Sequence, residues 1–301
     1  MKWIRRIGIV VGVIILAVAI GAGSVYAITG SRLSQKYVVP DEPPLAAATG
    51  DQVLIARGEH IATSIAKCAD CHGADLGGGI VIDAMPIGHV EATNLTTGKG
   101  GVLASYSDAT LERAIRHGIG IDGRNLVLMP SADYHNLSDA DVEAVIAYIR
   151  SRPQVDREHQ PSTVGPLLRT LWVAGKMVPI GAATIRHDAP HMKVTPVGNN
   201  VNAGRYIAVN GCAGCHGATY SGGPIPGTPP DWKPTANLTP TGIGHYSLAD
   251  FTRVLREGLR PGGTVVDTLM PVKATKLMSD DEIESVYKFL KTLPPKAFGL
   301  R

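Results

Sequence analysis

Two five-residue segments of the sequence combine two thiols with an imidazole. Residues 68–72 read CADCH, and residues 212–216 read CAGCH. All the cysteines of the chain lie in these segments: Cys68, Cys71, Cys212 and Cys215. Thiols two residues apart can close a disulfide, bind zinc, act as a redox dithiol or form thioethers to a haem. Because His72 and His216 follow directly, the correct chemistry has to explain the imidazole as well.

The pattern C-x-x-C-H is the attachment signature of c-type haem. Two thiols on one turn reach the two vinyl groups of the porphyrin, and the next residue lies beneath the ring, where its imidazole binds iron. Zinc needs a further matched pair of ligands, which neither segment has close by. A redox dithiol explains neither the histidine nor the repetition. The sequence therefore favours two haem c groups, with His72 and His216 as axial ligands.

A second axial ligand is predicted at two matching methionines. Met129 and Met270 each lie in an LMP sequence, 57 and 54 residues after the corresponding histidine. A thioether is a soft, neutral ligand that favours ferrous iron and closes the last coordination position. A lone methionine is more often a core residue, but its recurrence at the corresponding place favours ligation. Met85 and Met278 are second choices, because neither has a methionine counterpart.

Two further sets of residues are predicted to lie near the haems. Asn94 and Asn237 recur in NLT, which is also a glycosylation acceptor in eukaryotic secretion; the repetition favours a hydrogen bond near the haem. Four arginines either face the haem propionates or lie on solvated helix faces: Arg113, Arg116, Arg253 and Arg256. The histidines without a matching histidine are interpreted as surface or structural residues: His89, His117, His135 and His245.

One module occurs twice along the chain. Residues 56–79, which lead through the first cysteine pair, return as residues 202–223, and further matching segments follow in the same order. The offset between the copies is 144 residues at the histidines and 141 at the methionines. Two similar domains are therefore expected, which suits a chain of 301 residues.

Each copy predicts three helices joined by long loops. The first helix leads into the cysteine pair, and the second begins near Ser107 in one copy and near Ser247 in the other. The third begins with a capping box, in which a serine hydroxyl accepts from an otherwise unpaired backbone N–H. The capping residues are Ser138 with Asp141, and Ser279 with Glu282. Helical spacing predicts a buried stripe on the third helix. Its members are Val142, Val145, Ile146 and Ile149, then Ile283, Val286, Tyr287 and Leu290.

Residues 7–28 form an apolar run of 22 residues without a charge. At about 1.5 Å per residue, a helix of this length spans the roughly 30 Å hydrocarbon core of a bilayer. Lys2, Arg5 and Arg6 precede the run, which predicts a cytoplasmic N-terminus with the rest of the chain across the membrane. The alternative is a cleaved signal peptide with its site at Ala27, although the apolar region of such signals is shorter.

The composition suits large buried cofactors. Aromatic residues make up 5% of the chain, beside 35 Gly and 21 Pro, so its domains would have thin cores unless a cofactor filled them. A loop-rich secreted protein has the same composition. Beyond the three basic residues at the N-terminus, 29 − 3 = 26 basic residues balance 26 acidic ones. This neutral remainder is not expected to bind nucleic acid.

These motifs resemble class I cytochromes c, specifically the multihaem cytochrome c subunits of bacterial membrane-bound alcohol- and gluconate-type dehydrogenases. The resemblance covers about residues 50–153 and 200–296. It rests on CxxCHG, on NLTPTGIGHYSLADFTRVLREGL with the MP that follows, and on the terminal LSDxD helix. Those subunits usually carry three haems, whereas this chain has two sites, and its first module has a looser second motif.

The resemblance implies a mainly α fold with two tandem class I cytochrome c modules and an N-terminal transmembrane helix. The predicted organisation is a membrane anchor or signal (1–30), a first cytochrome c domain (31–153), an irregular linker (154–201) and a second cytochrome c domain (202–301). The middle of the linker, PLLRTLWVAGKMV, predicts a short helix packed on a module.

The predicted function is that of an electron carrier anchored in the bacterial inner membrane, with both haem domains in the periplasm. Such a protein would pass single electrons between partners such as a dehydrogenase, a quinol-oxidising complex or a terminal oxidase. A dihaem peroxidase is the alternative, and it needs one iron with an open coordination position, against which the two matching methionines argue. A haem-based sensor would need a signalling domain, for which the assigned segments leave no residues.

Overall fold

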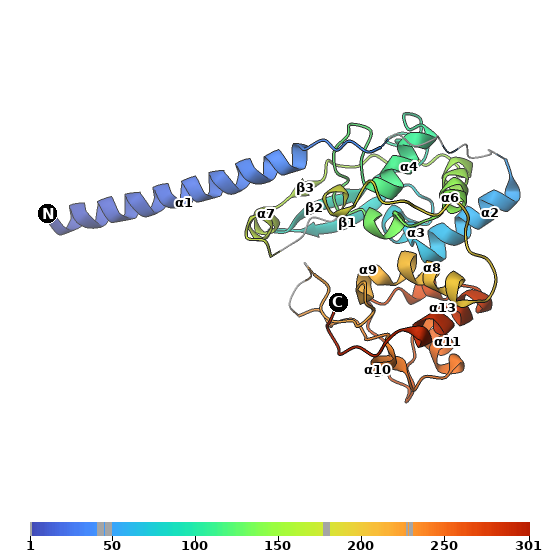
Figure 1. The fold of residues 1–301 in the computed structure, drawn as a ribbon. Coiled ribbons are helices and arrows are strands. Elements are labelled where there is room, and N and C mark those ends of the chain that lie inside the picture. Colours follow the sequence, from blue (N-terminus) through green and yellow to red (C-terminus); the bar gives the residue numbers. More distant parts are fainter. Residues whose placement is uncertain (1, 41–44, 46–49, 177–180, 227, 229–230) are drawn as a thin grey trace.

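Figure 1 shows a computed structural model that describes residues 2–40, 45, 50–176, 181–226, 228 and 231–301. A single long helix, α1 (Lys2–Ser34), projects from a body of two helical domains that lie against each other. The predicted mainly α fold is confirmed, with one small sheet as the exception. Helix α1 extends six residues beyond the apolar run that ends at Ile28.

The first domain is built around the packing of its first helix on its last. Its helical segments are α2 (Gln52–His60), the π-helical turn η1 (Ile61–Ile65), α3 (Cys68–His72), α4 (Asp108–His117), α5 (Ser131–Tyr134) and α6 (Asp139–Ser151). Helix α2 packs on α6, and the stripe predicted on α6 is buried. A Cβ on Gly58 would lie 1.9 Å from the carbonyl oxygen of Ala144, so the two backbones approach as closely as only glycine allows.

The second domain repeats this arrangement. Its helices are α8 (Val201–Gly211), α9 (Ala213–His216), α10 (Pro240–Ile243), α11 (Leu248–Glu257), α12 (Val272–Thr275) and α13 (Asp280–Thr292). Helix α8 packs on α13, and a Cβ on Gly204 would lie 1.8 Å from the carbonyl oxygen of Ser285. The stripe on α13 is buried at Ile283, Val286 and Leu290, while Tyr287 is partly buried and donates its hydroxyl to the carbonyl of Tyr246.

The helix caps follow the predictions with one exception. The serine hydroxyls of Ser107, Ser247 and Ser279 each accept a backbone N–H of the first turn. Ser138 does the same on α6, but the return bond from Asp141 that a capping box requires was predicted wrongly. The Asp141 carboxylate instead accepts Arg57 Nε and Nη2, at 3.0 Å each, and the hydroxyl of Tyr206 at 2.8 Å. A charged donor and a tyrosine from the other domain outcompete the helix end.

A three-stranded antiparallel sheet in the first domain was not predicted. Strand β2 (Gly88–Ala92) lies between β1 (Gly79–Ala84) and β3 (Thr163–Val164). Because β3 belongs to the linker, the linker is part of the packing of the first domain. It continues through α7 (Pro166–Val173) and the 3-10 turn η2 (Ala182–Thr184). The predicted linker helix is therefore present over its first eight residues, whereas Met177 and Val178 lie outside the described residues.

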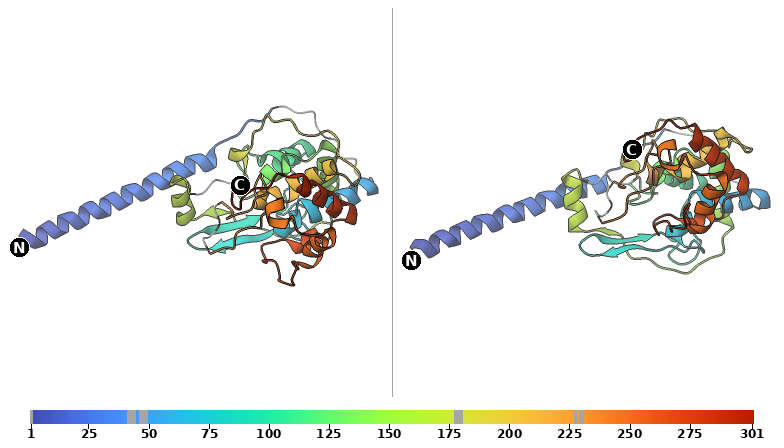
Figure 2. Two further views of the ribbon diagram at one scale, coloured as in Figure 1. Left: turned by 60° about the horizontal axis from the view of Figure 1, so that its bottom comes forward. Right: turned by 90° about the horizontal axis from the view of Figure 1, so that it is seen from below.

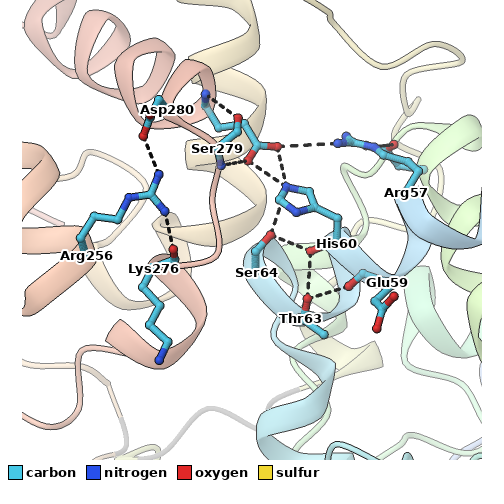
Figure 3. Close-up of polar contacts among 11 residues, drawn as sticks. Arg57, Glu59, His60, Thr63, Ser64, Arg256, Lys276, Ser279 and Asp280 are labelled. Atoms are coloured by element: carbon cyan, nitrogen blue, oxygen red, sulfur yellow. Dashed lines mark hydrogen bonds and ion pairs between the residues drawn. The ribbon is translucent and has the colours of Figure 1, made fainter. Parts of the chain in front are cut away.

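The two domains share one continuous apolar core, which is closed at one side by ion pairs. Segment η1 of the first domain contacts α8 and α12 of the second. His60 Nε2 lies 2.8 Å from both carboxylate oxygens of Glu282 in the second domain. Figure 3 shows His60 of the first domain facing Ser279, the N-cap of the helix that carries Glu282. Arg57 Nη1 lies 3.7 Å from the same carboxylate while its other nitrogens hold Asp141. These contacts fix the orientation of one domain on the other.

We expect Glu282→Gln to lower the free energy of unfolding by about 1–2 kcal/mol, since it removes the charge from a largely buried hydrogen bond. Burial raises the pKa of Glu282, but bonds from His60 and from the Ser279 backbone outweigh it, so the pKa is lowered. The stabilisation is therefore present above the ordinary pKa of a glutamate and lost as the pH falls through the lowered value. Urea denaturation at several pH values measures it. Glu284, which is half-buried and pairs with Lys288 on the same helix, is the control. An equal loss in Glu284→Gln would contradict the interface assignment.

Candidate haem sites

Each domain encloses a cavity at its cysteine pair. The first has a volume of about 550 Å³, within the 300–1,000 Å³ range of cofactor sites, and Cys68, Cys71, His72 and Met129 all line it. Helix α3 carries the first three of these residues. The structure therefore brings the predicted thioether and axial ligands of the first site to one cavity.

The second cavity has the same set of residues but is narrower. Cys212, Cys215, His216 and Met270 line it, and its volume is about 140 Å³. Most of the lining is apolar, with Leu255, Val286 and Leu290 among the residues, as a porphyrin face requires.

The two histidines are held in the tautomer that an iron ligand needs. Nδ1 of His72 lies 2.8 Å from the carbonyl oxygen of Thr93, and Nδ1 of His216 lies 2.8 Å from that of Ala236. A carbonyl only accepts, so Nδ1 carries the proton and Nε2 keeps a lone pair for a metal. Burial lowers the pKa of both imidazoles, which keeps them neutral. Thr93 and Ala236 were missed from the sequence, although each directly precedes the repeated asparagine.

Asn94 and Asn237 fix the loops that carry these carbonyls. Asn94 Nδ2 donates to the carbonyl of Val155 at 2.7 Å, and its Oδ1 accepts the N–H and hydroxyl of Thr96. Asn237 bonds in the same way to the carbonyl of Lys296 and to Thr239. Both amides are buried and fully occupied by protein partners. The asparagines thus hold in place the loops whose Thr93 and Ala236 carbonyls accept from the two histidines. Because both amides are buried, glycosylation of the folded chain is disfavoured.

We expect Asn94→Ala to lower the free energy of unfolding by about 2 kcal/mol, because it leaves the Val155 carbonyl and the Thr96 N–H buried without their partner. Urea denaturation measures the loss. Asn136 is exposed, and Asn136→Ala is expected to change the free energy by less than about 0.5 kcal/mol. A loss at Asn94 no larger than that at Asn136 would contradict the role of the asparagine loop.

Met129 and Met270 line the two cavities at matching positions. The second choices, Met278 and Met85, have no methionine at the matching position of the other copy. Met129 and Met270 directly precede the N-cap prolines of α5 and α12, Pro130 and Pro271. Met278 also lines the second cavity, but it occupies the place of Leu137 in the first, and both side chains are buried in the core. Met85 was a second choice that the structure contradicts, since it is 77% exposed in the turn between β1 and β2 and lines neither cavity.

The surroundings of the thiols suit neutral sulfur. Burial raises the pKa of Cys68 to about 12 and that of Cys212 to about 11. Redox dithiols and zinc sites work through thiolates and depend on a lowered pKa. A thioether carries no charge, so burying it has no such cost. The raised pKa values therefore favour covalent attachment over the redox-dithiol alternative.

The four arginines divide into two pairs with different surroundings. Arg116 is fully buried, against the prediction of a solvated face, because it donates to Glu112, Asp139 and the carbonyls of His135 and Leu137. Its counterpart bonds in the same way: Arg256 donates to the carbonyl of Lys276 and to Asp280 (Figure 3). Neither is among the residues that line the two cavities, and their protein partners already occupy most of their donors.

Arg113 and Arg253 have matching hydrogen-bond patterns. Each gives Nη2 to a backbone carbonyl seven residues on, Gly120 and Arg260. In both, Nε is buried without a hydrogen-bond partner among the described residues. Buried donors are rarely left unpaired, but neither arginine lines a cavity, so a contact with a haem propionate stays a prediction for this pair.

The histidines without counterparts lie outside both cavities. His117 and His135 are buried and stack at 5.3 Å between ring centroids; His89 is half-buried between Asp83 and Glu91, and His245 is exposed against Tyr246. Glu112, Asp139 and His191 have ligand atoms within 4.8 Å of one another. The guanidinium of Arg116 already neutralises both carboxylates, which disfavours a metal ion there.

Lys67 joins the two sites and was not predicted. It directly precedes Cys68, and its Nζ donates to the carbonyls of Ile65 at 2.7 Å and Gly211 at 2.9 Å. Gly211 directly precedes Cys212, so this hydrogen bond joins the residues that immediately precede the two cysteine motifs. The Lys67 side chain lines both cavities. No sequence signal marks this contact, because the second copy has glycine where the first has lysine.

Both halves of the chain match cytochrome c families. Residues 54–149 match the family described as cytochrome c oxidase, cbb3-type, subunit III, and residues 201–294 match the family described as cytochrome c. The chain thus belongs to the c-type cytochromes: it contains two cytochrome c domains, and these indicate c-type haem as the cofactor. The donor sets described above fit that group.

Its relatives are cytochrome subunits of dehydrogenases. The chain is 27% identical to the fructose dehydrogenase cytochrome subunit of Gluconobacter japonicus, over 86% of this chain and 56% of that protein. It is 27% identical to the cytochrome c subunit of the quinone alcohol dehydrogenase of Komagataeibacter europaeus, over 93% and 62%. It is 28% identical to the gluconate 2-dehydrogenase cytochrome c subunit of Pantoea cypripedii, over 84% and 62%. The chain thus spans less than two thirds of these relatives, and the similarity implies electron transfer.

Proposed function

We propose that the chain is a membrane-anchored dihaem c-type cytochrome that transfers single electrons to or from a dehydrogenase on the periplasmic side of the bacterial inner membrane. One observation carries this proposal: each domain has a cavity lined by two cysteines, a histidine and a methionine, and Lys67 lines both cavities. Lys67 also bonds to the carbonyl that directly precedes the second cysteine motif. Two one-electron centres so close together suit relay of electrons along one chain.

The residues have distinct roles in this proposal. Cys68 and Cys71 attach the first haem and Cys212 and Cys215 the second. Each bound haem supplies a one-electron iron centre. His72 and His216 present Nε2 to iron because their Nδ1 protons are bonded to carbonyls. Met129 and Met270 would supply a thioether ligand to each iron, which would leave no coordination site for a substrate. The chain is therefore proposed as an electron carrier and not as an enzyme.

The fixed domain interface supports the relay. The shared apolar core and the His60–Glu282 contact hold the domains in one orientation. Electron transfer between two centres needs a constant separation, which a flexible tether between the domains would not provide. Lys67 Nζ, bonded to a carbonyl on each side of the boundary, lies at the junction of the two motifs.

The membrane side of the proposal rests on α1. It is the one helix among the described residues that is long and apolar enough to cross a membrane. Basic residues at its start favour a cytoplasmic N-terminus. The helix continues without a break through Ala27, where a signal peptide would be cleaved, and packs against α7 beyond that point. Continuity and packing support an anchor, and the names of the relatives support a dehydrogenase as partner.

Purification from native membranes in mild detergent tests this function. We expect a dehydrogenase to co-purify and its substrate, found among alcohols, gluconate and fructose, to reduce both haems in the absorption spectrum without an added mediator. Catalytic turnover of hydrogen peroxide together with a high-spin ferric band would contradict the carrier assignment and favour the peroxidase, which the relatives do not support.

A further inference from the structure

Helix α7 is attached to the C-terminal turns of α1. Arg169 Nη1 donates to Thr29 Oγ1 at 2.7 Å, and its guanidinium lies 4.7 Å from the centre of the Tyr26 ring. Arg32 lies in the same way 5.5 Å from the Trp172 ring. Thr29 is fully buried. All three views show α7 crossing beside this end of α1 (Figures 1 and 2).

The position of this contact along α1 sets its depth in a membrane. The apolar run ends at Ile28. At about 1.5 Å per residue, Arg32 lies roughly 6 Å above the end of the run. The polar headgroup layer is roughly 5–8 Å thick on each side of the hydrocarbon core. When the apolar run spans the core, the residues that hold α7 therefore lie at the level of the lipid headgroups.

The side chains at this level match those of a membrane interface. Tyr26 and Trp172 are the aromatic types that collect at headgroup depth. Leu167 in α7 is 41% exposed, and its N–H donates to the Pro86 carbonyl in the β1–β2 turn, where Met85 is 77% exposed. The turn projects to the side from which α1 leaves (Figure 2). Two neighbouring segments thus each expose a large apolar side chain.

The charges nearby favour anionic lipid. Residues 29–36 and 166–176 contain four basic residues, Arg32, Lys36, Arg169 and Lys176, and no acidic one. Asp83 is the acidic residue close to the turn, and it is paired with His89 at 3.2 Å. Juxtamembrane basic residues are attracted to anionic headgroups by about 1 kcal/mol each.

We propose that α7 and the β1–β2 turn form a second membrane contact, a lipid-binding face that lies in the headgroup layer and fixes the tilt of the first domain. This inference rests on the proposed membrane anchor. Apolar side chains of Met85 and Leu167 enter the interface, while Arg32 and Arg169 stay at phosphate level. The face explains why α7 packs on α1 and on the turn together.

The face also places the first haem site. Leu33 of α1 and Val164 and Arg169 around α7 line the first cavity, whereas no described residue of α1 or α7 lines the second. The first haem site is therefore bounded by the elements that touch the membrane. It is the site from which electrons would exchange with a membrane-side partner.

Photocrosslinking of the full-length, haem-loaded protein tests the lipid-binding face. The protein is reconstituted in vesicles of phosphatidylcholine and phosphatidylglycerol that carry a diazirine in the headgroup region, and lipid adducts are located by peptide mass spectrometry. We expect adducts on α1, on α7 and on the β1–β2 turn, several-fold above those on α2, which lies at the opposite end of the first domain (Figure 1). A variant with Met85→Glu and Leu167→Glu should lose adducts on α7 and the turn several-fold and keep those on α1. Val53→Glu, at an 81% exposed position in α2, is the matched control.

The outcomes separate this inference from the anchor on which it rests. Adducts confined to α1 would overturn the lipid-binding face and leave the membrane anchor intact. Adducts on neither α1 nor α7 would overturn both. If Val53→Glu reduced the α7 adducts as much as the Met85→Glu, Leu167→Glu variant does, the lipid-binding face would also be overturned. An added negative charge would then reduce lipid contact wherever it was placed.

Discussion

A variant with Cys68→Ser and Cys71→Ser is expected to carry one covalently bound haem where the unchanged protein carries two. Both thioethers of the first site are lost, while the second site keeps its own cysteine pair, at the N-cap and within α9, and its own core between α8 and α13. The matched variant with Cys212→Ser and Cys215→Ser should lose the other haem. Intact mass and haem-stained gels count the haems in each case.

The two variants also test whether the sites are independent. A variant that kept both haem increments would contradict the attachment assignment. Loss of both haems from either variant would contradict independent folding of the two sites. We expect neither, although the shared interface predicts that each variant unfolds at a lower urea concentration, since a domain without its cofactor has a thinner core.

Met129→Ala and Met270→Ala are each expected to remove one methionine-to-iron absorption in the red and to lower one midpoint potential. Thioether ligation stabilises the ferrous state, and axial ligands shift haem potentials over a range of about 0.8 V. Each variant should therefore move one of two potentials by a substantial part of that range and leave the other nearly unchanged. Spectra of the oxidised protein and a potentiometric titration measure both effects.

Two neighbouring methionines provide the controls. Met278→Leu restores the residue type of the first copy at Leu137, and Met85→Leu changes an exposed turn. Both should keep the two red absorptions and both potentials. If the absorptions survived a combined change of Met129 and Met270 to alanine, or disappeared in Met278→Leu, the ligand assignment would be wrong.

The repeat explains why so much was predictable. The motif C-x-x-C-H and the sequence LMP each contain residue types that bind haem or iron. Each occurs once in both copies, which makes a chance occurrence less probable than for a single motif. The helix starts at Ser107, Ser247 and Ser279 were also predictable, because capping depends on residues within one turn. Local chemistry that is repeated in the chain can be inferred from sequence.

Contacts between distant segments were not predictable. Strand β3 joins β2 from about 70 residues further along the chain, and two residues of strand leave no period to detect. Asp141 has the sequence context of a capping residue, yet Arg57 and Tyr206, 84 and 65 residues away, take its carboxylate. Arg116 has the helix position of an exposed residue and is buried by carbonyls that follow α5. In each case tertiary packing overrides the local pattern.

The contact at Lys67 and the attachment of α7 to α1 belong to the same class. The Lys67 contact lies where the two domains meet, and the α7 contact lies where α1 meets the linker. Two functional inferences that the sequence alone did not give rest on these contacts. These are the direct apposition of the haem sites and the proposed lipid-binding face.

The intact mass of the protein purified from its native membrane tests the central claim most directly. We expect the mature polypeptide to keep the residues of α1 and to carry two haem increments that survive denaturation. A polypeptide that has lost the residues up to and including Ala27 would contradict the anchor alone. A mass without haem increments would contradict the account as a whole.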